Sequence, residues 1–100
     1  FHCDCDIVVR SLTQAMSAPG TAASDLFLKS VSVEDMVQGN EYVIALEDRV
    51  VWRKIRNVKG CAEQWRLVAV DRAAYPDIII NKSEIRAVWR VIARMAMLVS

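Results

Sequence analysis

The fold class is decided by the stretch Glu41-Tyr-Val-Ile-Ala-Leu-Glu-Asp-Arg-Val-Val-Trp-Arg-Lys-Ile-Arg56. It contains two apolar runs, Glu41–Leu46 and Val50–Arg56, separated by the polar triplet Glu47-Asp48-Arg49. β-branched and aromatic residues fit a pleated surface better than a helix, and a short polar turn between two such runs is typical of a hairpin. The sequence therefore predicts an antiparallel β-hairpin here.

Runs of similar composition lie on both sides of this hairpin, and glycine- or proline-containing turn signals separate them. The predicted strands are Asp6–Ser11, Asp25–Ser30, Glu41–Leu46, Val50–Arg56, Gln64–Val70 and a short buried strand Ile78–Ile80. Loops are expected at Ser17–Ser24 and Asn57–Glu63, and a turn at Tyr75-Pro76-Asp77. The sequence thus predicts a mainly β protein without internal repeats.

The last element, Ile85 to Val99, fits two periodicities. Its apolar residues follow the 3.6-residue spacing of an amphipathic helix. Arg86, Arg90 and Arg94 are all even-numbered, so they would also share one face of a strand. Periodicity alone leaves helix and strand open for this segment.

Composition limits the class of protein. The 100 residues include 54% hydrophobic and 25% charged side chains with a net charge of +1, which excludes a disordered tail and lacks the basic excess of a free-standing nucleic-acid-binding domain. Residues 1–100 are expected to form one domain.

No apolar run approaches the roughly 18 residues of a membrane span, and no signal peptide is recognisable. An odd count of three cysteines favours a reducing compartment, so we expect a cytoplasmic protein.

The stretch His2-Cys3-Asp4-Cys5-Asp6 contains metal-ligand residue types, but a second ligand pair at zinc-site spacing is missing, since only Cys61 remains. We therefore predict neither a metal site nor a cofactor. His2 is the only histidine and lies near the terminus, which argues against Ser-His or Cys-His catalysis. A Ser/Lys dyad is the remaining nucleophilic chemistry.

The basic residues near Trp52, from Arg49 to Lys59, are expected to form a solvated sheet face, because Glu41, Glu47, Asp48 and Glu63 are close in sequence.

Three stretches, taken together, resemble the C-terminal domain of LexA-type repressors, a family that includes lambdoid phage repressors and UmuD mutagenesis proteins. The first runs from Asp6 through Ala15-Met16 to Asp25-Leu26, similar to a strand leading into Gly-x-Ser-Met and a loop ending in Gly-Asp-Leu. The second is Gly39 to Ile55, similar to a hairpin ending in Val-x-Val-Lys-Arg-Leu. The third joins the Trp65 strand to Tyr75-Pro76 and the closing segment from Ser83. The resemblance implies a bent, largely antiparallel β-sheet assembly, in which Ile85 to Val99 is a strand.

The chain departs from this family at its catalytic dyad. Ala15 stands where the serine nucleophile is expected, and Arg53 stands where the lysine general base is expected. A methyl group cannot attack a carbonyl, and arginine stays protonated. The resemblance therefore implies a peptidase-like domain that has lost its activity, with Ala15 either a natural or an engineered replacement.

A second alignment keeps a dyad. Ser17 and Lys54 have nearly the same separation as Ala15 and Arg53. Choosing Ser17 breaks the match of Met16, and moving from position 53 to 54 turns the side chain to the other face of the strand. An active self-cleaving Ser17/Lys54 peptidase is therefore the alternative.

The resemblance implies the oligomerisation and regulatory domain of a bacterial or phage transcriptional repressor. It further implies a homodimer or higher oligomer, control within an SOS-type response through a RecA-like filament or an antirepressor, and DNA contact only through an N-terminal domain. Because the chain starts at Phe1, we expect that DNA-binding domain and the cleaved segment to lie upstream. A UmuD-like polymerase accessory role is a further alternative.

Overall fold

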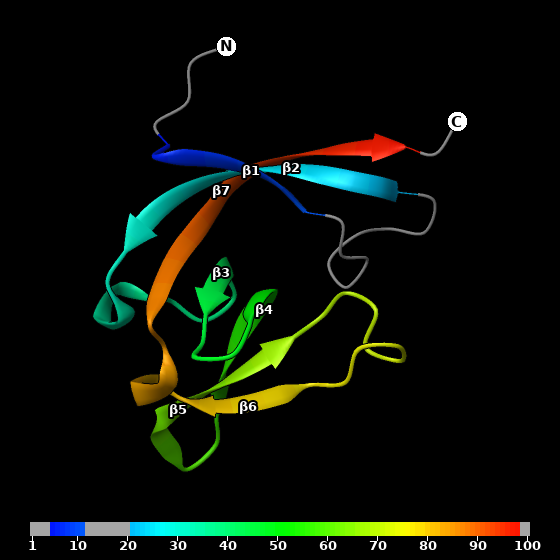
Figure 1. Cartoon of the computed structure of the whole chain (residues 1–100). Helices are drawn as coiled ribbons and strands as arrows, with labels where there is room; N and C mark the ends of the chain where they lie inside the picture. Colours follow the sequence, from blue (N-terminus) through cyan, green and yellow to red (C-terminus); the bar gives the residue numbers. More distant parts are fainter. Residues whose placement is uncertain (1–4, 12–20, 99–100) are drawn as a thin grey trace.

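The structure is a computed structural model that describes residues 5–11 and 21–98. Within these ranges seven strands form one antiparallel sheet with the order β1-β2-β7-β3-β4-β5-β6 (Figure 1). The strands are β1 (Ile7–Ser11), β2 (Thr21–Val31), β3 (Glu41–Ala45), β4 (Val50–Val58), β5 (Cys61–Val68), β6 (Ile78–Asn81) and β7 (Ala87–Leu98). Two single 3-10 turns, η1 (Val33–Asp35) and η2 (Lys82–Glu84), precede β3 and β7. The prediction of a mainly β, antiparallel fold is confirmed.

The central hairpin forms as the sequence predicts. Strands β3 and β4 pair from Glu41–Lys54 to Ala45–Val50, and the Leu46 amide donates to the Arg49 carbonyl oxygen across the turn at 2.8 Å. Strand β3 is buried on both faces, because Tyr42 and Ile44 pack on one side and Val43 on the other. The apolar run that predicted this strand therefore reflects its central place in the sheet.

The last segment is a strand, which agrees with the resemblance rather than with the helical spacing. Strand β7 lies between β2 and β3 and hydrogen-bonds to both. It is long and curved, so it joins the β1–β2 hairpin to the β3–β6 part of the sheet (Figure 1). The helical spacing failed because β7 is covered on different faces along its length, so its apolar residues are distributed over both faces.

A β-bulge changes which arginines share a face of β7. Phe27 pairs with Ala93 and Leu28 with Val91, so Ile92 is an extra residue in β7. Strict alternation predicted a shared face for Arg90 and Arg94, and the bulge places them on opposite faces. Arg90 is paired with Tyr42, whereas Arg94 lies over the Trp52 ring on the other side.

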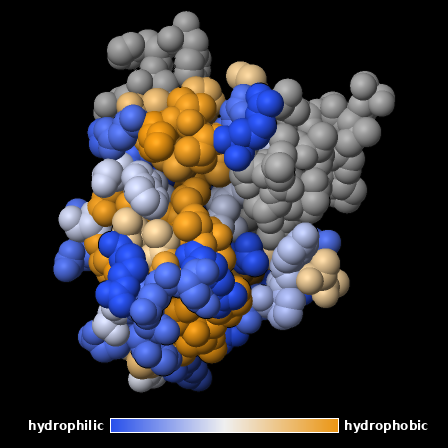
Figure 2. Space-filling model, in the orientation of Figure 1, coloured by the Kyte–Doolittle hydropathy of each residue, from blue (hydrophilic) through white to orange (hydrophobic). Residues whose placement is uncertain are grey.

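Two apolar clusters lie on opposite faces of the sheet. The larger one fills the β3–β6 part and consists of Met36, Tyr42, Ile44, Ile55, Trp65, Leu67, Ile80, Ile85 and Val88. The smaller one lies between the β1–β2 hairpin and the central strands and consists of Leu26, Leu28, Val43 and Trp52. In Figure 2 a band of hydrophobic side chains runs down the molecule, flanked by hydrophilic ones. Because the sheet is bent, the β3–β6 part encloses the larger cluster on one face, and the β1–β2 hairpin covers the smaller cluster on the other face.

Several predicted boundaries were wrong. Strand β2 begins at Thr21, inside the predicted loop Ser17–Ser24, because it pairs with the far end of β7. The predicted loop Asn57–Glu63 shrinks to a turn at Lys59-Gly60, where Gly60 adopts φ +81°. Strand β5 starts at Cys61 and ends at Val68. Ile79 of the predicted buried strand is 50% exposed, because it pairs with Arg66 on the face opposite to the larger apolar cluster, whereas its neighbour Ile80 belongs to that cluster.

Candidate functional site

The four dyad positions fall into two groups. Ala15 and Ser17 lie outside the described residues, in the connection between β1 and β2. Arg53 and Lys54 are adjacent on β4, so their side chains project from opposite faces of the sheet. Arg53 faces the side of the larger apolar cluster, since it pairs with Tyr42. Only one of these two basic residues can therefore point toward any given site.

Arg53 is a buried cation with few partners. It is 9% exposed, its Nη1 donates to the carbonyl oxygen of Trp52 at 3.0 Å, and its Nε has no hydrogen-bond partner. The guanidinium carbon lies 5.7 Å from the centre of the Tyr75 ring. Burial lowers the pKa of Arg53, and repulsion from Arg49 adds to this effect, while Tyr75 opposes it. A lowered arginine pKa still leaves a protonated side chain at neutral pH, so Arg53 cannot act as a general base.

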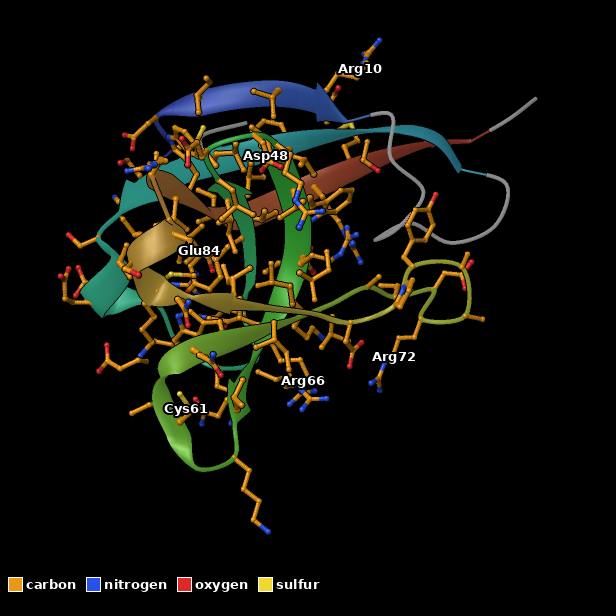
Figure 3. All side chains as sticks on the ribbon, turned by 60° about the horizontal axis from the view of Figure 1, so that its bottom comes forward. Arg10, Asp48, Cys61, Arg66, Arg72 and Glu84 are labelled. Carbon is orange, nitrogen blue, oxygen red and sulfur yellow. The ribbon has the colours of Figure 1, made fainter. Side chains whose placement is uncertain are left out.

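Lys54 instead lies in a basic groove on the opposite face. The groove encloses about 370 Å³. Its basic lining residues are Lys54 and Arg56 from β4, Arg66 from β5 and Arg72 from the β5–β6 loop. Val68, Ala69 and Val70 supply its apolar lining. Arg66 and Arg72 project to the same side of the molecule in Figure 3. The structure thus divides the predicted basic face: Arg53 points inward, and Lys54 joins cations from later in the chain.

Asp77 is the carboxylate bonded to the groove arginines. Arg72 binds it through two hydrogen bonds, Nε to Oδ1 at 3.1 Å and Nη2 to Oδ2 at 2.6 Å. Arg66 Nη1 lies 3.6 Å from Oδ2. The hydrogen bond from Arg72 lowers the pKa of Asp77 most, and Arg66 lowers it further. Asp77 therefore stays ionised and holds the two arginines at one end of the groove.

The acidic residues expected to balance the basic face either bind other groups, as Glu41 does, or lie elsewhere in the fold. Glu41 pairs with Lys54 in register, but its Oε1 accepts from Trp52 Nε1 at 2.9 Å and lies 3.5 Å from Arg94 Nη1. Glu63 lines a different cavity, beside Trp65. Glu47 and Asp48 line a third, of about 510 Å³, between the β3–β4 turn and β6. The prediction of a solvated, charge-balanced face is therefore wrong, because Arg53 is buried and the acidic side chains close in sequence do not form ion pairs with Lys54 or Arg56.

Sequence reasoning missed Arg66, Arg72 and Asp77. Arg66 could have been placed beside Arg56, because a β4–β5 hairpin with a turn at Gly60 brings these strands together. Nothing in the sequence indicated that the β5–β6 loop folds back and brings Arg72 to the groove lined by Arg56 and Arg66. Of the stretch His2–Asp6, which contains metal-ligand residue types but was not predicted to bind a metal, positions 2–4 lie outside the described residues. Within residues 5–11 and 21–98, no group of three metal-ligating side chains occurs.

No protein-family model and no curated protein sequence matches the chain. In the described part of the chain, no helix has the length and apolar character that crossing a membrane requires.

Proposed function

We propose that the chain is the C-terminal oligomerisation and regulatory domain of a bacterial or phage transcriptional repressor, similar to LexA and lambdoid phage repressors but without peptidase activity. The bent antiparallel sheet is the kind of fold that this resemblance implies. The resemblance itself rests on the three sequence stretches. Operator recognition would belong to an N-terminal domain, and dimerisation would match the two-fold symmetry of that operator.

The observation that carries the loss of activity is the environment of Arg53. The position where the family has its lysine base holds an inward-facing, buried guanidinium. A lysine at such a site can lose its proton when burial lowers its pKa enough, whereas a guanidinium remains charged. The buried Arg53 therefore supports a domain that retains the fold of the family but lacks its peptidase activity.

An exposed apolar face supports self-association. Val8 and Met95 are 51% and 60% exposed. In register they lie on one face of the β1–β2–β7 layer, because Val8 pairs with Phe27, Phe27 with Ala93, and Met95 lies two residues along β7. This face is opposite to the one that packs on Leu26 and Leu28. A second copy of the chain would cover these side chains.

Sedimentation equilibrium at tens of micromolar tests this association. We expect a mass of twice the 11.3 kDa of one chain. The Val8→Lys/Met95→Lys double variant should sediment as a monomer, since two charges would be buried in the interface. Val37→Lys, at a 57% exposed position in another part of the fold, is the control and should remain dimeric. A monomeric wild-type chain at this concentration would contradict the proposal.

Self-cleavage distinguishes the proposal from the active Ser17/Lys54 alternative. A longer form that includes the upstream residues should yield no fragment pair by mass spectrometry after incubation at raised pH, where lysine is more often neutral. A fragment pair that Ser17→Ala and Lys54→Ala both abolish, and that Lys59→Ala leaves unchanged, would overturn the inactive assignment. The UmuD-like alternative requires a short arm, and not a helix-turn-helix domain, in any longer form of the protein.

A further inference from the structure

We propose that the basic groove between β4, β5 and the β5–β6 loop binds the phosphodiester backbone of nucleic acid. The geometry of the groove supports this binding independently of the regulatory role proposed above. The net charge of +1 for the whole chain conceals the local excess: four cationic side chains line the groove, and Asp77 is the carboxylate that pairs with two of them.

Two like charges form a cross-strand pair in the groove. Arg56 and Arg66 lie directly opposite each other in the β4–β5 ladder. Like charges at such positions destabilise a sheet. Asp77 relieves this repulsion on the Arg66 side. Within the described residues, no carboxylate lies within ion-pair distance of Lys54 or Arg56, so a bound anion would supply the missing countercharge.

The chemistry and spacing of the four cations also favour a chain of phosphates as the ligand. Lys54 and Arg56 are two residues apart on one face of β4, so their positions are separated by roughly 7 Å along the strand. Arg66 and Arg72 extend the positive charge across the sheet (Figure 3). Guanidinium groups bind phosphate oxygens in a bidentate manner, and lysine binds them as a point charge. An elongated row of such donors fits a chain of phosphates better than one isolated anion.

The lining also predicts the kind of recognition. Among the described residues that line this groove none is aromatic, so these side chains offer no surface on which bases could stack. The apolar lining includes Val70, which is 58% exposed. Contacts to phosphate position a nucleic acid without reading its sequence. We therefore expect binding that is independent of base sequence and sensitive to salt.

Fluorescence anisotropy of a labelled DNA duplex of arbitrary sequence tests the proposal. Neutralising about three phosphates gives a slope of about −3 for the logarithm of affinity against the logarithm of salt concentration. The Lys54→Gln/Arg56→Gln double variant should weaken binding at least about tenfold at low salt and reduce the slope by about two. Both substitutions remove cations that have no carboxylate partner among the described residues, so the melting temperature should be retained.

The matched control is the Arg49→Gln/Lys59→Gln double variant. It removes the same charge from the β3–β4 and β4–β5 turns, outside the groove, and should bind the duplex nearly as the wild type does. An equal loss in both double variants would indicate general charge attraction and overturn the proposal. A groove that binds inorganic phosphate, detected by NMR shifts of Arg56 and Arg66, but binds no duplex would also overturn it.

Discussion

Ile55→Ala is expected to lower the free energy of unfolding by about 3 to 4 kcal/mol, the upper range for truncating a fully buried aliphatic side chain. Ile55 is 0% exposed and belongs to the larger apolar cluster. It pairs with Leu67 of β5, and its backbone also bonds to the segment before β3, with Asn40 and Gly39 as partners. The cavity would therefore open where three segments of the chain meet, and the surroundings can close it only partly.

Urea unfolding followed by tryptophan fluorescence measures this loss. Val50→Ala at the start of the same strand is the matched control, because Val50 is 64% exposed and its truncation should change stability by less than about 0.5 kcal/mol. Equal effects of the two substitutions would contradict the burial of Ile55 in this sheet.

Arg53→Met should raise the free energy of unfolding by about 1 to 2 kcal/mol, although it removes a hydrogen bond to the Trp52 carbonyl oxygen. The guanidinium loses hydration on burial, has an unpartnered Nε, and lies near the like charge of Arg49. Replacing a buried ionic group by an apolar side chain of similar length is often neutral or stabilising. Methionine would retain most of the packing and remove the cost of desolvating the charge.

The same urea titration checks this second expectation. Lys59→Met, in the exposed β4–β5 turn, is the control and should leave stability within about 0.5 kcal/mol of the wild type. A loss of more than about 1 kcal/mol in Arg53→Met would contradict the expectation and show that the hydrogen bond to the Trp52 carbonyl oxygen and the contact with the Tyr75 ring outweigh the cost of burying the charge.

The sequence predicted strands best where the signal was local. The β3–β4 hairpin was correct nearly to the residue, because two apolar runs and a polar turn specify each other over a short distance. The start of β2 and the faces of β7 were wrong because both depend on pairing between distant segments. No local pattern marks Ile92 as the extra residue that moves Arg94 to the face opposite Arg90.

The candidate site was predictable only in part. The alternation along β4 correctly separates Arg53 from Lys54, since adjacent residues of a strand face opposite sides. The sequence could not reveal that Arg66 and Arg72 join Lys54, or that Glu63 lies elsewhere, because the partners of a sheet face come from other strands and loops. The acidic residues closest in sequence to the basic residues of β4 therefore did not identify the carboxylate that pairs with the groove arginines, which is Asp77.

The central position of β7 has a consequence for synthesis on the ribosome. The chain emerges from its N-terminal end, so the β1–β2 hairpin and the β3–β6 strands are both made before the strand that lies between them. Until β7 has left the exit tunnel, β2 and β3 each present an unpaired edge, and such edges can pair with other nascent chains. Crowding of ribosomes on one messenger would therefore be the condition under which this protein is most prone to misassembly.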